Sequence, residues 1–464
     1  MAKKALPVSG ATGPVEKYKK NKGTVGRRRI VFIGASYQFV HKVLRDMLLV
    51  GGFNDCEVVV HDIEPKPIKI VGDLLERMVR QAKAKITVTR TLDRREALKG
   101  ADAAVLSITT GGKEADFRTF EVCAKYGIPV GVGDTLGPTA LARNLREIPI
   151  VLDMIRDMED VCPDALMLNF TNPMSCITGA MARRGSIPCW GLCHSADALV
   201  QYFSEVFAVP RSQVRMEIGG VNHQSFVTRL WIRGKDRTKD ILEATAASKA
   251  KFKDTLLTTK EETTQLQQDV YKVLGAWPSC GDTHLAEFYR FFFTPRHVGS
   301  MKHEMHHVIP GRAAFGPKEP PKIIMDWAYG PGGVGDMNRI TGEHAHELMW
   351  SCFTKEPFSR VLNLLNTQEY IKGLPRDACV EAMVTVSGKK VTGKCVTLPT
   401  AVQALVHNWT SIHDLSIRSA IECDRDAARQ ALFLDPHVHD MYDIAPMLED
   451  LLLAIKPWLP AKWF

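Results

Sequence analysis

Short apolar runs alternate with segments of helical periodicity along the first part of the chain. Residues 29–33 are rich in β-branched side chains and end at Gly34, after which apolar side chains recur at helical spacing over residues 39–48. A second β-branched run, residues 57–60, stops at His61 and Asp62. Strand, turn, helix and strand in this order predict a βαβ unit. Further strand candidates are residues 85–88, 103–107, 127–130 and 166–170.

The alternation continues to about residue 190 and predicts an α/β fold with a doubly wound, Rossmann-type parallel sheet. A long helical pattern runs over residues 141–155, with a kink expected at Pro149. We expect a Rossmann domain at residues 29–197, preceded by a tail of residues 1–28, and an α+β domain at residues 198–464. That last domain carries strand patterns at 214–218 and 225–232 and helical patterns at 249–274, 401–406 and 425–434.

Composition and charge exclude several classes of protein. The 464 residues are 45% hydrophobic and 24% charged, as in an ordinary globular protein. No apolar stretch approaches the ~18 residues of a membrane span, and no secretory signal is evident. Much of the net charge of +8 lies in the tail, which we interpret as a flexible basic extension rather than a nucleic-acid arm. The eleven cysteines contain no CxxC pair, which favours reduced thiols in the cytoplasm.

The first strand-to-helix turn is a candidate dinucleotide site. A pyrophosphate needs small residues at this turn, but residues 33–39 keep one glycine and lack the full GxGxxG spacing. The alternative is an ordinary βα turn. Asp62, at the end of the second strand, favours NAD over NADP because a carboxylate can accept the ribose hydroxyls. The predicted cofactor-binding residues are Gly34, Ser36, Tyr37, Gln38, Phe39, Asp62, Thr110 and Gly111.

Four polar strings downstream carry candidate chemistry: residues 169–173, 191–195, 219–223 and 281–288. Each has a structural alternative, such as an Asx turn before proline, a buried cysteine beside a surface histidine, or a helix start at Asp282. One cysteine with one or two histidines cannot make a structural zinc site, which needs four protein ligands. It can make an open site that substrate oxygens complete.

Taken together, these strings resemble glycoside hydrolase family 4, whose fold resembles that of lactate and malate dehydrogenases. The resemblance runs from about Arg29 to the C-terminus and includes residues 133–138, 398–399 and 434–436. It implies NAD and a divalent metal, most simply Mn²⁺, with Cys193 and His223 as metal ligands. Asn172, Arg143 and Asn222 are then expected to bind the sugar. Asp282 matches the proposed base, and His194 is expected to assist the leaving group.

The resemblance implies an α-glycosidase or α-uronidase that uses NAD without net oxidation. In such enzymes the sugar is oxidised at C3 and deprotonated at C2, the aglycone is eliminated, water adds, and the hydride returns. Two departures from the family pattern are the missing glycine of the cofactor turn and Thr139-Ala140 in place of Gly-Gly. The alternatives are an NAD-dependent 2-hydroxy-acid or sugar dehydrogenase and a catalytically silent sugar- or nucleotide-binding protein. A homo-dimer or homo-tetramer would fit the family.

Overall fold

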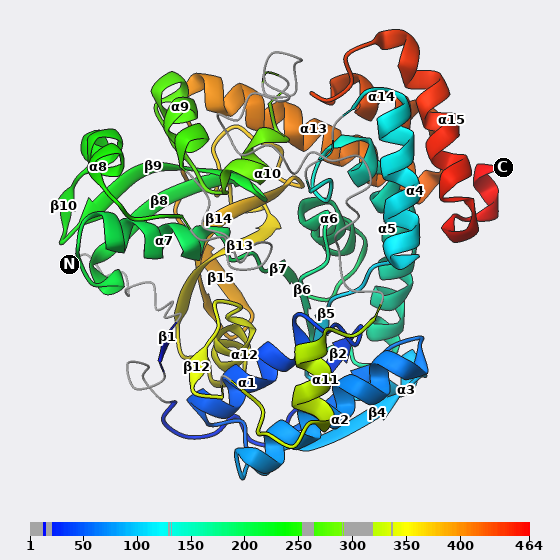
Figure 1. Cartoon of the computed structure of the whole chain (residues 1–464), viewed down its shortest axis with the longest axis vertical. Helices are drawn as coiled ribbons and strands as arrows, with labels where there is room; N and C mark the ends of the chain where they lie inside the picture. The colour runs from blue at the N-terminus through cyan, green and yellow to red at the C-terminus, as the bar shows by residue number, and fades with distance from the viewer. Residues whose placement is uncertain are drawn as a thin grey trace.

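A single mixed sheet forms the centre of the molecule (Figure 1). The computed structural model describes residues 13–14, 21–128, 130, 132–252, 264–289, 291, 319–335 and 337–464. Within this part of the chain the sheet has 13 strands, in the order β10-β9-β8-β14-β13-β7-β6-β5-β2-β3-β4, with β11 on β9 and β15 on β14. Its two halves differ in strand direction and in helical covering.

The first half is the predicted doubly wound sheet. Its six strands, β7 to β4 in the order above, are all parallel. The order reverses at β2, because β3 lies on one side of it and β5 on the other, and ligands bind at such switch points. The strands are β2 Arg29–Ile33, β3 Glu57–His61, β4 Thr87–Thr91, β5 Ala103–Leu106, β6 Leu166–Asn169 and β7 Cys189–Gly191.

Helices connect these strands and cover the sheet. They are α1 Val40–Val50, α2 Pro65–Gln81, α3 Arg94–Leu98, α4 Gly112–Lys125, α5 Gly137–Val161 and α6 Met174–Arg184. Helix α5 is continuous through Pro149, where the sequence predicted a kink. The predicted strand at residues 127–130 is not an element of the fold: residues 126–128 form a turn at the end of α4, and Pro129 lies outside the described residues.

The second half extends the same sheet with antiparallel strands. Asn363 of β13 pairs with Gly191 of β7, so the two halves share one continuous hydrogen-bonded sheet. The sequence predicted β8 and β9 but missed the long strands β13 and β14. The strands are β8 Val214–Val221, β9 Gln224–Ile232, β10 Lys235–Asp236, β11 Trp277–Pro278, β13 Phe358–Leu365, β14 Cys379–Ser387 and β15 Lys390–Gly393.

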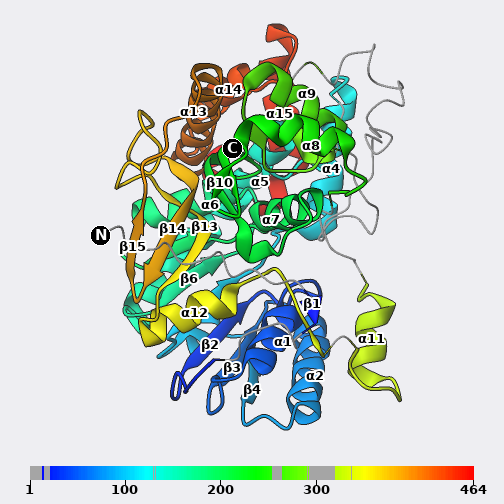
Figure 2. The same ribbon diagram turned by 90° about the vertical axis from the view of Figure 1, so that its left-hand side faces the viewer.

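The C-terminal helices pack on the Rossmann half. Helix α13 lies against α5 and α14, and α15 lies against α4 (Figures 1 and 2). The helices of this half are α7 Ser195–Val206, α8 Ile241–Ala247, α9 Gln265–Leu274, α10 Asp282–Ala286, α11 Lys322–Tyr329, α12 Ala345–Thr354, α13 Thr400–Glu422, α14 Arg425–Leu434 and α15 Ile444–Ala454. Short 3₁₀ turns are η2 Arg211–Gln213, η3 Thr238–Asp240, η6 Met441–Asp443, η7 Lys456–Trp458 and η8 Ala461–Trp463.

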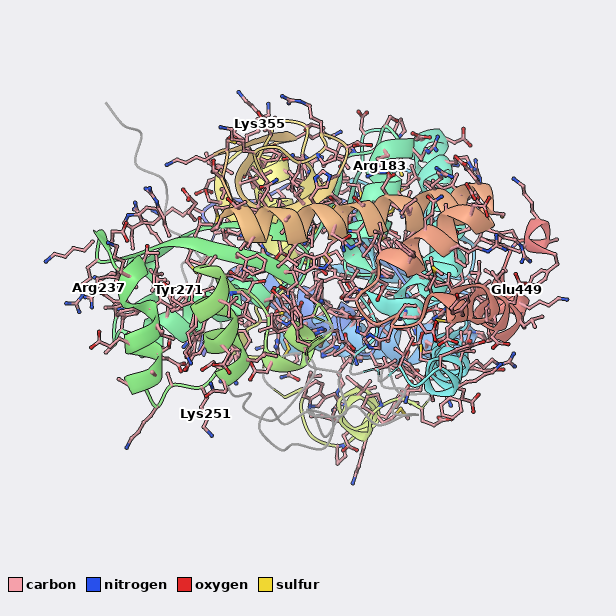
Figure 3. All side chains as sticks on the ribbon, turned by 90° about the horizontal axis from the view of Figure 1, so that it is seen from above. Arg183, Arg237, Lys251, Tyr271, Lys355 and Glu449 are labelled. Atoms are coloured by element: carbon pink, nitrogen blue, oxygen red, sulfur yellow. The ribbon has the colours of Figure 1, made fainter. Side chains whose placement is uncertain are left out.

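Charged side chains lie at both ends of the molecule (Figure 3). Arg237 and Glu449 lie at opposite ends of the molecule when it is viewed from above (Figure 3). Of the basic tail, β1 (Gly13–Pro14) pairs with β12 (Arg339–Ile340), and residues 1–12 and 15–20 lie outside the described residues. Arg28 forms an ion pair of 2.8 Å with Asp102, so the end of the tail is fastened to the Rossmann half. Among the described residues, no helix is both long and apolar enough to span a bilayer.

Candidate active site

The cofactor turn after β2 depends on a glycine at position 34. Gly34 has a φ of +95°, and a Cβ built there would lie 2.1 Å from the carbonyl oxygen of Ser107, after β5. Its backbone N–H donates to the carbonyl of His61 at the end of β3 (2.8 Å). The turn is therefore pressed between the two neighbouring strands at the switch point, and a side chain at this position cannot be accommodated without moving backbone.

Asp62 holds this turn from the end of β3. Its Oδ2 accepts the N–H of Ala35 at 2.7 Å, and its Oδ1 accepts the N–H of Glu64 at 3.0 Å. The carboxylate is partly exposed, and each oxygen keeps a second lone pair for a ribose hydroxyl. The predicted acid of the dinucleotide site is thus placed at the switch point beside the glycine turn.

The other predicted cofactor residues lie in two turns at the same sheet edge. The hydroxyl of Ser36 accepts the N–H of Gln38 (3.2 Å), and the ring of Phe39 lies 5.1 Å from that of Phe170. Burial, followed by the nearby charge of Asp62, raises the pKa of Tyr37.

The turn after β5 is fixed by helix α5. Glu147 accepts both the N–H and the hydroxyl of Thr110, each at 2.7 Å, and Arg146 donates to the carbonyl of Thr110. Gly111 has a φ of +74° and is covered by Trp458 from the C-terminus. Arg143, which we predicted to contact the sugar, donates to the hydroxyl of Thr109 (2.9 Å) from the same helix. Buried charges of α5 therefore set the position of this turn.

Three buried side chains converge beside these turns. Asp134, His223 and His284 each place a ligand atom within 4.8 Å of the others. They come from the loop before α5, the β8–β9 hairpin turn and helix α10. The two imidazole rings lie 4.2 Å apart between centroids. A carboxylate with two imidazoles is a donor set that suits a divalent transition metal.

Thr135 orients His223 within this group. Its hydroxyl donates to Asp134 Oδ1 at 2.9 Å and lies 2.8 Å from His223 Nδ1. Because the hydroxyl has one proton, giving it to Asp134 leaves the oxygen to accept from Nδ1–H. With a proton on Nδ1, the ring nitrogen left to coordinate a metal is Nε2. A threonine thus performs the orienting role that a carbonyl or carboxylate often has at metal-binding histidines.

The charge of Asp134 is maintained despite its burial. Burial is the largest influence and by itself raises the pKa, but His284, His223 and Arg143 together hold the pKa of this carboxyl below its usual value. Asn172 adds a hydrogen bond from Nδ2 to Asp134 Oδ2 (2.6 Å). The group therefore presents an anion between two imidazoles.

Two buried carboxylates hold the loop that carries Asp134. Glu287, at the end of α10, accepts the N–H groups of Val132 (2.5 Å) and Gly133 (2.9 Å). Asp435 accepts the N–H of Gly137 at 2.8 Å at the other end of the loop. The loop is thus clamped from the C-terminal half of the chain at both ends.

Two asparagines predicted to bind sugar present acceptor atoms near this group. Asn172 and Asn222 are bonded through Nδ2, to Asp134 and to Glu381 (3.3 Å) respectively. The Oδ1 atom of each is buried and has no protein donor among the residues that the structure describes. Such orphan acceptors are rare in folded proteins and suit ligand hydroxyls.

Cys193 and His194 lie at the turn between β7 and α7. The thiol of Cys193 is 3.3 Å from the hydroxyl of Ser195, and burial raises its pKa to about 11. Its sulfur is not part of the Asp134–His223–His284 group. His194 is the N-terminal cap residue of α7 and is half-buried. The structure therefore brings His223 together with Asp134 and His284, and it places Cys193 outside that group.

Asp282 makes the contacts of a helix cap. Its two carboxylate oxygens accept the N–H groups of Leu266 and Gln267, each at 3.3 Å, in the first turn of α9. Its role as the base stays a prediction from the resemblance.

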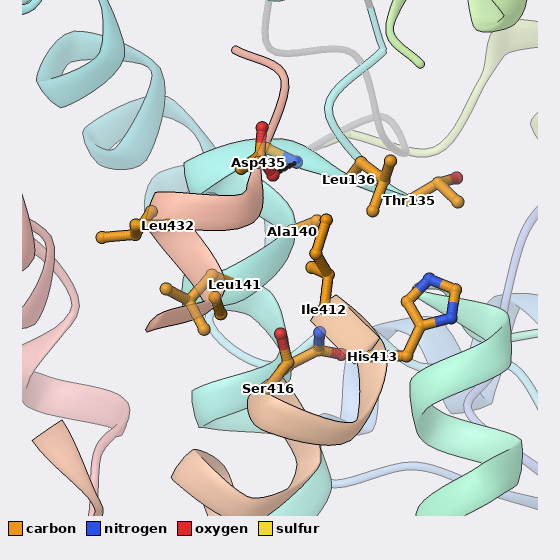
Figure 4. Close-up of a pocket in the computed structure, with 12 residues that line it drawn as sticks. Thr135, Leu136, Ala140, Leu141, Ile412, His413, Ser416, Leu432 and Asp435 are labelled. Carbon is orange, nitrogen blue, oxygen red and sulfur yellow. Dashed lines mark hydrogen bonds between the residues drawn. The ribbon is translucent and has the colours of Figure 1, made fainter. Parts of the chain in front are cut away.

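A small cavity of about 10 Å³ lies behind Thr135, between α5, α13 and α14 (Figure 4). This space suits one water molecule and not a sugar. His413 lines it, and both ring nitrogens lack a hydrogen-bond partner among the described residues. Burial lowers the pKa of His413 to about 4, so this ring is neutral near pH 7. This cavity is therefore not the place where a sugar binds.

Sequence reasoning gave no role to Asp134 or Glu381. Asp134 follows the apolar residues 128–132 in the string Gly133-Asp134-Thr135, so an acid after a strand-like run was the available signal. Glu381 is buried in β14 and accepts hydrogen bonds from Asn222, Ser225 and Asn363. The sequence offers a weaker indication for Glu381, because it is a single acid within the mostly apolar residues 378–386.

Comparison with known proteins extends along the chain. Residues 29–208 match "Family 4 glycosyl hydrolase" and residues 218–438 match "Family 4 glycosyl hydrolase C-terminal domain". An alpha-galactosidase of Bacillus subtilis is 30% identical over 93% of this chain and 99% of its own length. An alpha-glucosidase of Erwinia rhapontici is 27% identical over 93% and 98%. A 6-phospho-alpha-glucosidase from gut microorganisms, solved with NAD and Mn²⁺, superposes with a TM-score of 0.77 at 17% identity, over 94% and 99%. The chain belongs to glycosyl hydrolase family 4.

Proposed function

We propose that this enzyme hydrolyses α-glycosides or α-uronides with the help of NAD, which is regenerated in each turnover, and of a divalent metal that stays bound. The observation that carries the proposal is the buried Asp134–His223–His284 group beside a glycine turn at the switch point of a Rossmann sheet. A glycosidase that works through two carboxylates has no use for a dinucleotide site at this position.

The residues present fit both cofactors. The Gly34 turn has no room for a Cβ, and Asp62 stands at the end of the neighbouring strand, as a dinucleotide requires. Asp134, His223 and His284 supply oxygen and nitrogen donors that suit Mn²⁺. When bound, NAD⁺ takes and returns a hydride at the sugar C3, while the metal polarises the neighbouring sugar oxygens.

The protein's own groups then bind and orient the sugar and move protons. The free Oδ1 atoms of Asn172 and Asn222 accept sugar hydroxyls. Asp282 is proposed as the base for the C2 proton, and His194 as the donor to the leaving oxygen. Cys193 is proposed as a further metal ligand on the strength of the resemblance, which requires its thiol to exchange the Ser195 contact for the metal.

The substrate class follows from the relatives and from Arg143. The relatives described above act on α-galactosides and α-glucosides, as their names state. Arg143 is already bonded to Thr109 and lies 3.8 Å from Asp116, so it has an internal partner for its charge. This arrangement favours neutral α-glycosides over uronides, and both belong in the assay.

The test is a panel of aryl α-glycosides and α-uronides given to the purified enzyme with catalytic NAD⁺, Mn²⁺ and a reductant. We expect aglycone release without accumulation of NADH, and we expect this release to be lost in His223→Ala. Steady NADH formation on a hydroxy acid or free sugar would instead identify a dehydrogenase. No turnover with tight NAD binding would identify a binding protein.

Two further proposals concern the assembly and the compartment. Large apolar side chains are exposed on the C-terminal helices, at Phe433 (64%), Tyr442 (82%) and Leu453 (59%), and we propose that they contribute to a homo-dimer or homo-tetramer. Light scattering after size exclusion tests this, since a monomer at micromolar concentration contradicts it. None of the eleven cysteines, all within the described residues, forms a disulfide, in keeping with a cytoplasmic enzyme that draws on the cellular NAD pool.

A further inference from the structure

A cluster of buried charges lies next to the Cys193 turn but outside the site described above. Arg360 of β13 is 2% exposed and Asp197 of α7 is 6% exposed, and their closest atoms, Nη1 and Oδ2, are 2.7 Å apart. His344, the residue before α12, is fully buried between Asp197 (3.2 Å) and Glu347. The cluster therefore ties together β13, α7 and α12.

Arg360 also reaches the backbone of the predicted metal ligand. Its Nη2 donates to the carbonyl oxygen of Cys193 at 3.0 Å, while Nη1 faces Asp197 four residues later. One guanidinium thus spans the strand-to-helix turn that contains Cys193, His194 and Ser195. A planar fork of donors can hold a carbonyl and a carboxylate in a fixed relation, which a single ammonium cannot.

Stability alone is a weak explanation for such a cluster. Taking charged groups out of water carries a desolvation cost that their mutual attraction repays only in part, and well-packed apolar residues often stabilise a core as well. What a buried guanidinium supplies in addition is a directed hydrogen bond to one particular backbone oxygen. That oxygen belongs to Cys193.

We propose that Arg360 is a positioning residue that fixes the β7–α7 turn and so sets where the Cys193 thiol and the His194 ring lie. Asp197, supported by His344, holds the guanidinium in place. The consequence for catalysis rests on the proposed function, whereas the positioning of the turn does not.

The turn can be monitored through the Cys193 thiol itself. The full-length enzyme, as purified, is treated with iodoacetamide at one pH, and the rate of alkylation at each cysteine is followed by peptide mass spectrometry. Cys193 is buried, as are Cys176 and Cys189, while Cys395 is exposed and reports the reactivity of a free thiol. Each protein therefore contains its own protected and unprotected references.

The informative variants are Arg360→Lys and Arg360→Gln. Lysine keeps the charge and loses the fork, and glutamine keeps a donor for the carbonyl and loses the charge. The matched control is Arg183→Lys, because Arg183 also donates to one carbonyl (Asp377, 2.7 Å) and pairs with one carboxylate (Asp414, 2.6 Å), but on α6. Each substitution thus changes one carbonyl hydrogen bond and one ion pair.

We expect Arg360→Lys to raise the alkylation rate of Cys193 about tenfold, as local opening of one turn does, with Cys176 and Cys189 still protected. On a substrate that the panel identifies, kcat is expected to fall at least about tenfold, with a smaller change in KM, since misplacing reacting groups by ~1 Å has costs of this order. Arg183→Lys is expected to change neither quantity.

Three results would overturn the inference: an unchanged Cys193 rate in both Arg360 variants, a parallel rise at all buried cysteines, or the same rise in Arg183→Lys. The two proposals fail separately. Selective exposure of Cys193 in a protein that cleaves no glycoside leaves the positioning role intact and removes the proposed function. Glycosidase activity with unchanged labelling does the opposite.

Discussion

Replacing Gly34 with alanine tests the cofactor turn most sharply. The new Cβ would lie 2.1 Å from the Ser107 carbonyl oxygen, whereas real Cβ contacts begin at 3.0–3.4 Å. The two backbones must therefore separate by about 1 Å. A non-glycine residue at this positive φ adds a strain of ~1–2 kcal/mol. The Ser107 carbonyl leads directly into the turn that carries Thr110 and Gly111, so both predicted cofactor turns are displaced.

Gly51→Ala is the matched control for this change. Gly51 also has a positive φ, +75°, but a Cβ there meets nothing within 4 Å. Both variants are expected to lose stability from backbone strain, measured by urea unfolding. Only Gly34→Ala is expected to weaken NAD⁺ binding, by about tenfold to a hundredfold in calorimetry, since ~1 Å displacements have costs of this order.

The reasoning fails if Gly34→Ala binds NAD⁺ within about twofold of the wild type while remaining folded, because the close approach to Ser107 would then be irrelevant to the cofactor. It also fails if Gly51→Ala loses affinity to the same extent. Strain alone would then explain the loss.

Three further changes separate structural from chemical roles. Asp282→Asn keeps one oxygen for the α9 amides and turns its NH2 group toward the other amide, so stability should fall by ~1–3 kcal/mol. The kcat is expected to fall ~10²–10⁴-fold, and an unchanged kcat would leave Asp282 as a helix cap alone. Glu287→Ala leaves the Val132 and Gly133 amides without an acceptor, which costs ~1–3 kcal/mol each. It should weaken Mn²⁺ binding measured by electron paramagnetic resonance, whereas Glu287→Gln should retain the affinity for Mn²⁺. Equal Mn²⁺ affinity in the two variants would contradict the role of Glu287 in holding the Asp134 loop. Burial lowers the pKa of His413 to about 4 in the folded protein, which is below its value in the unfolded chain. Its contribution to stability is therefore complete above about pH 6.5 and is lost as the pH falls toward 4. His413→Phe should remove up to about 3 kcal/mol of this acid sensitivity in urea unfolding, and an unchanged pH profile would count against the burial of this ring as the cause.

The parallel half of the fold could be predicted because its strands are buried on both faces. Residues 58–60 and 103–106 are fully buried, so they appear in the sequence as continuous apolar runs between helical patterns. The strands β8 and β9 were also predicted, although not their pairing in a hairpin. The observed strand boundaries differ from the predicted ones by a few residues, as at β4, where the partly exposed strand has a weaker apolar pattern.

The strands β13 and β14 were missed because polar side chains interrupt their apolar pattern. Arg360 and Asn363 are buried in β13, and Glu381 is buried in β14. Asn363 donates a hydrogen bond to Glu381, and Arg360 donates one to the turn at Cys193. These partners come together only in the folded sheet. A sequence pattern assigns such residues to the surface, since charged groups are rarely buried without partners.

Two residues of the candidate site could be singled out from the sequence, and their roles stay predictions. His223 and Asn172 were identified by their strings, and the structure brings them to Asp134 and His284. No spacing reveals that group, because its members come from a loop, a hairpin turn and a short helix that only the fold brings together. Asp134 had no assigned role, although its loop was part of the family resemblance.

We propose that the glycosidic bond is broken by an elimination that begins with loss of the C2 proton. Turnover of a cleaved aryl α-glycoside in D₂O, followed by mass spectrometry and NMR of the released sugar, measures this directly. We expect deuterium on C2 of the product, with dependence on His223 and on catalytic NAD⁺. A product that retains only hydrogen at C2, formed at full rate without NAD⁺, would contradict it.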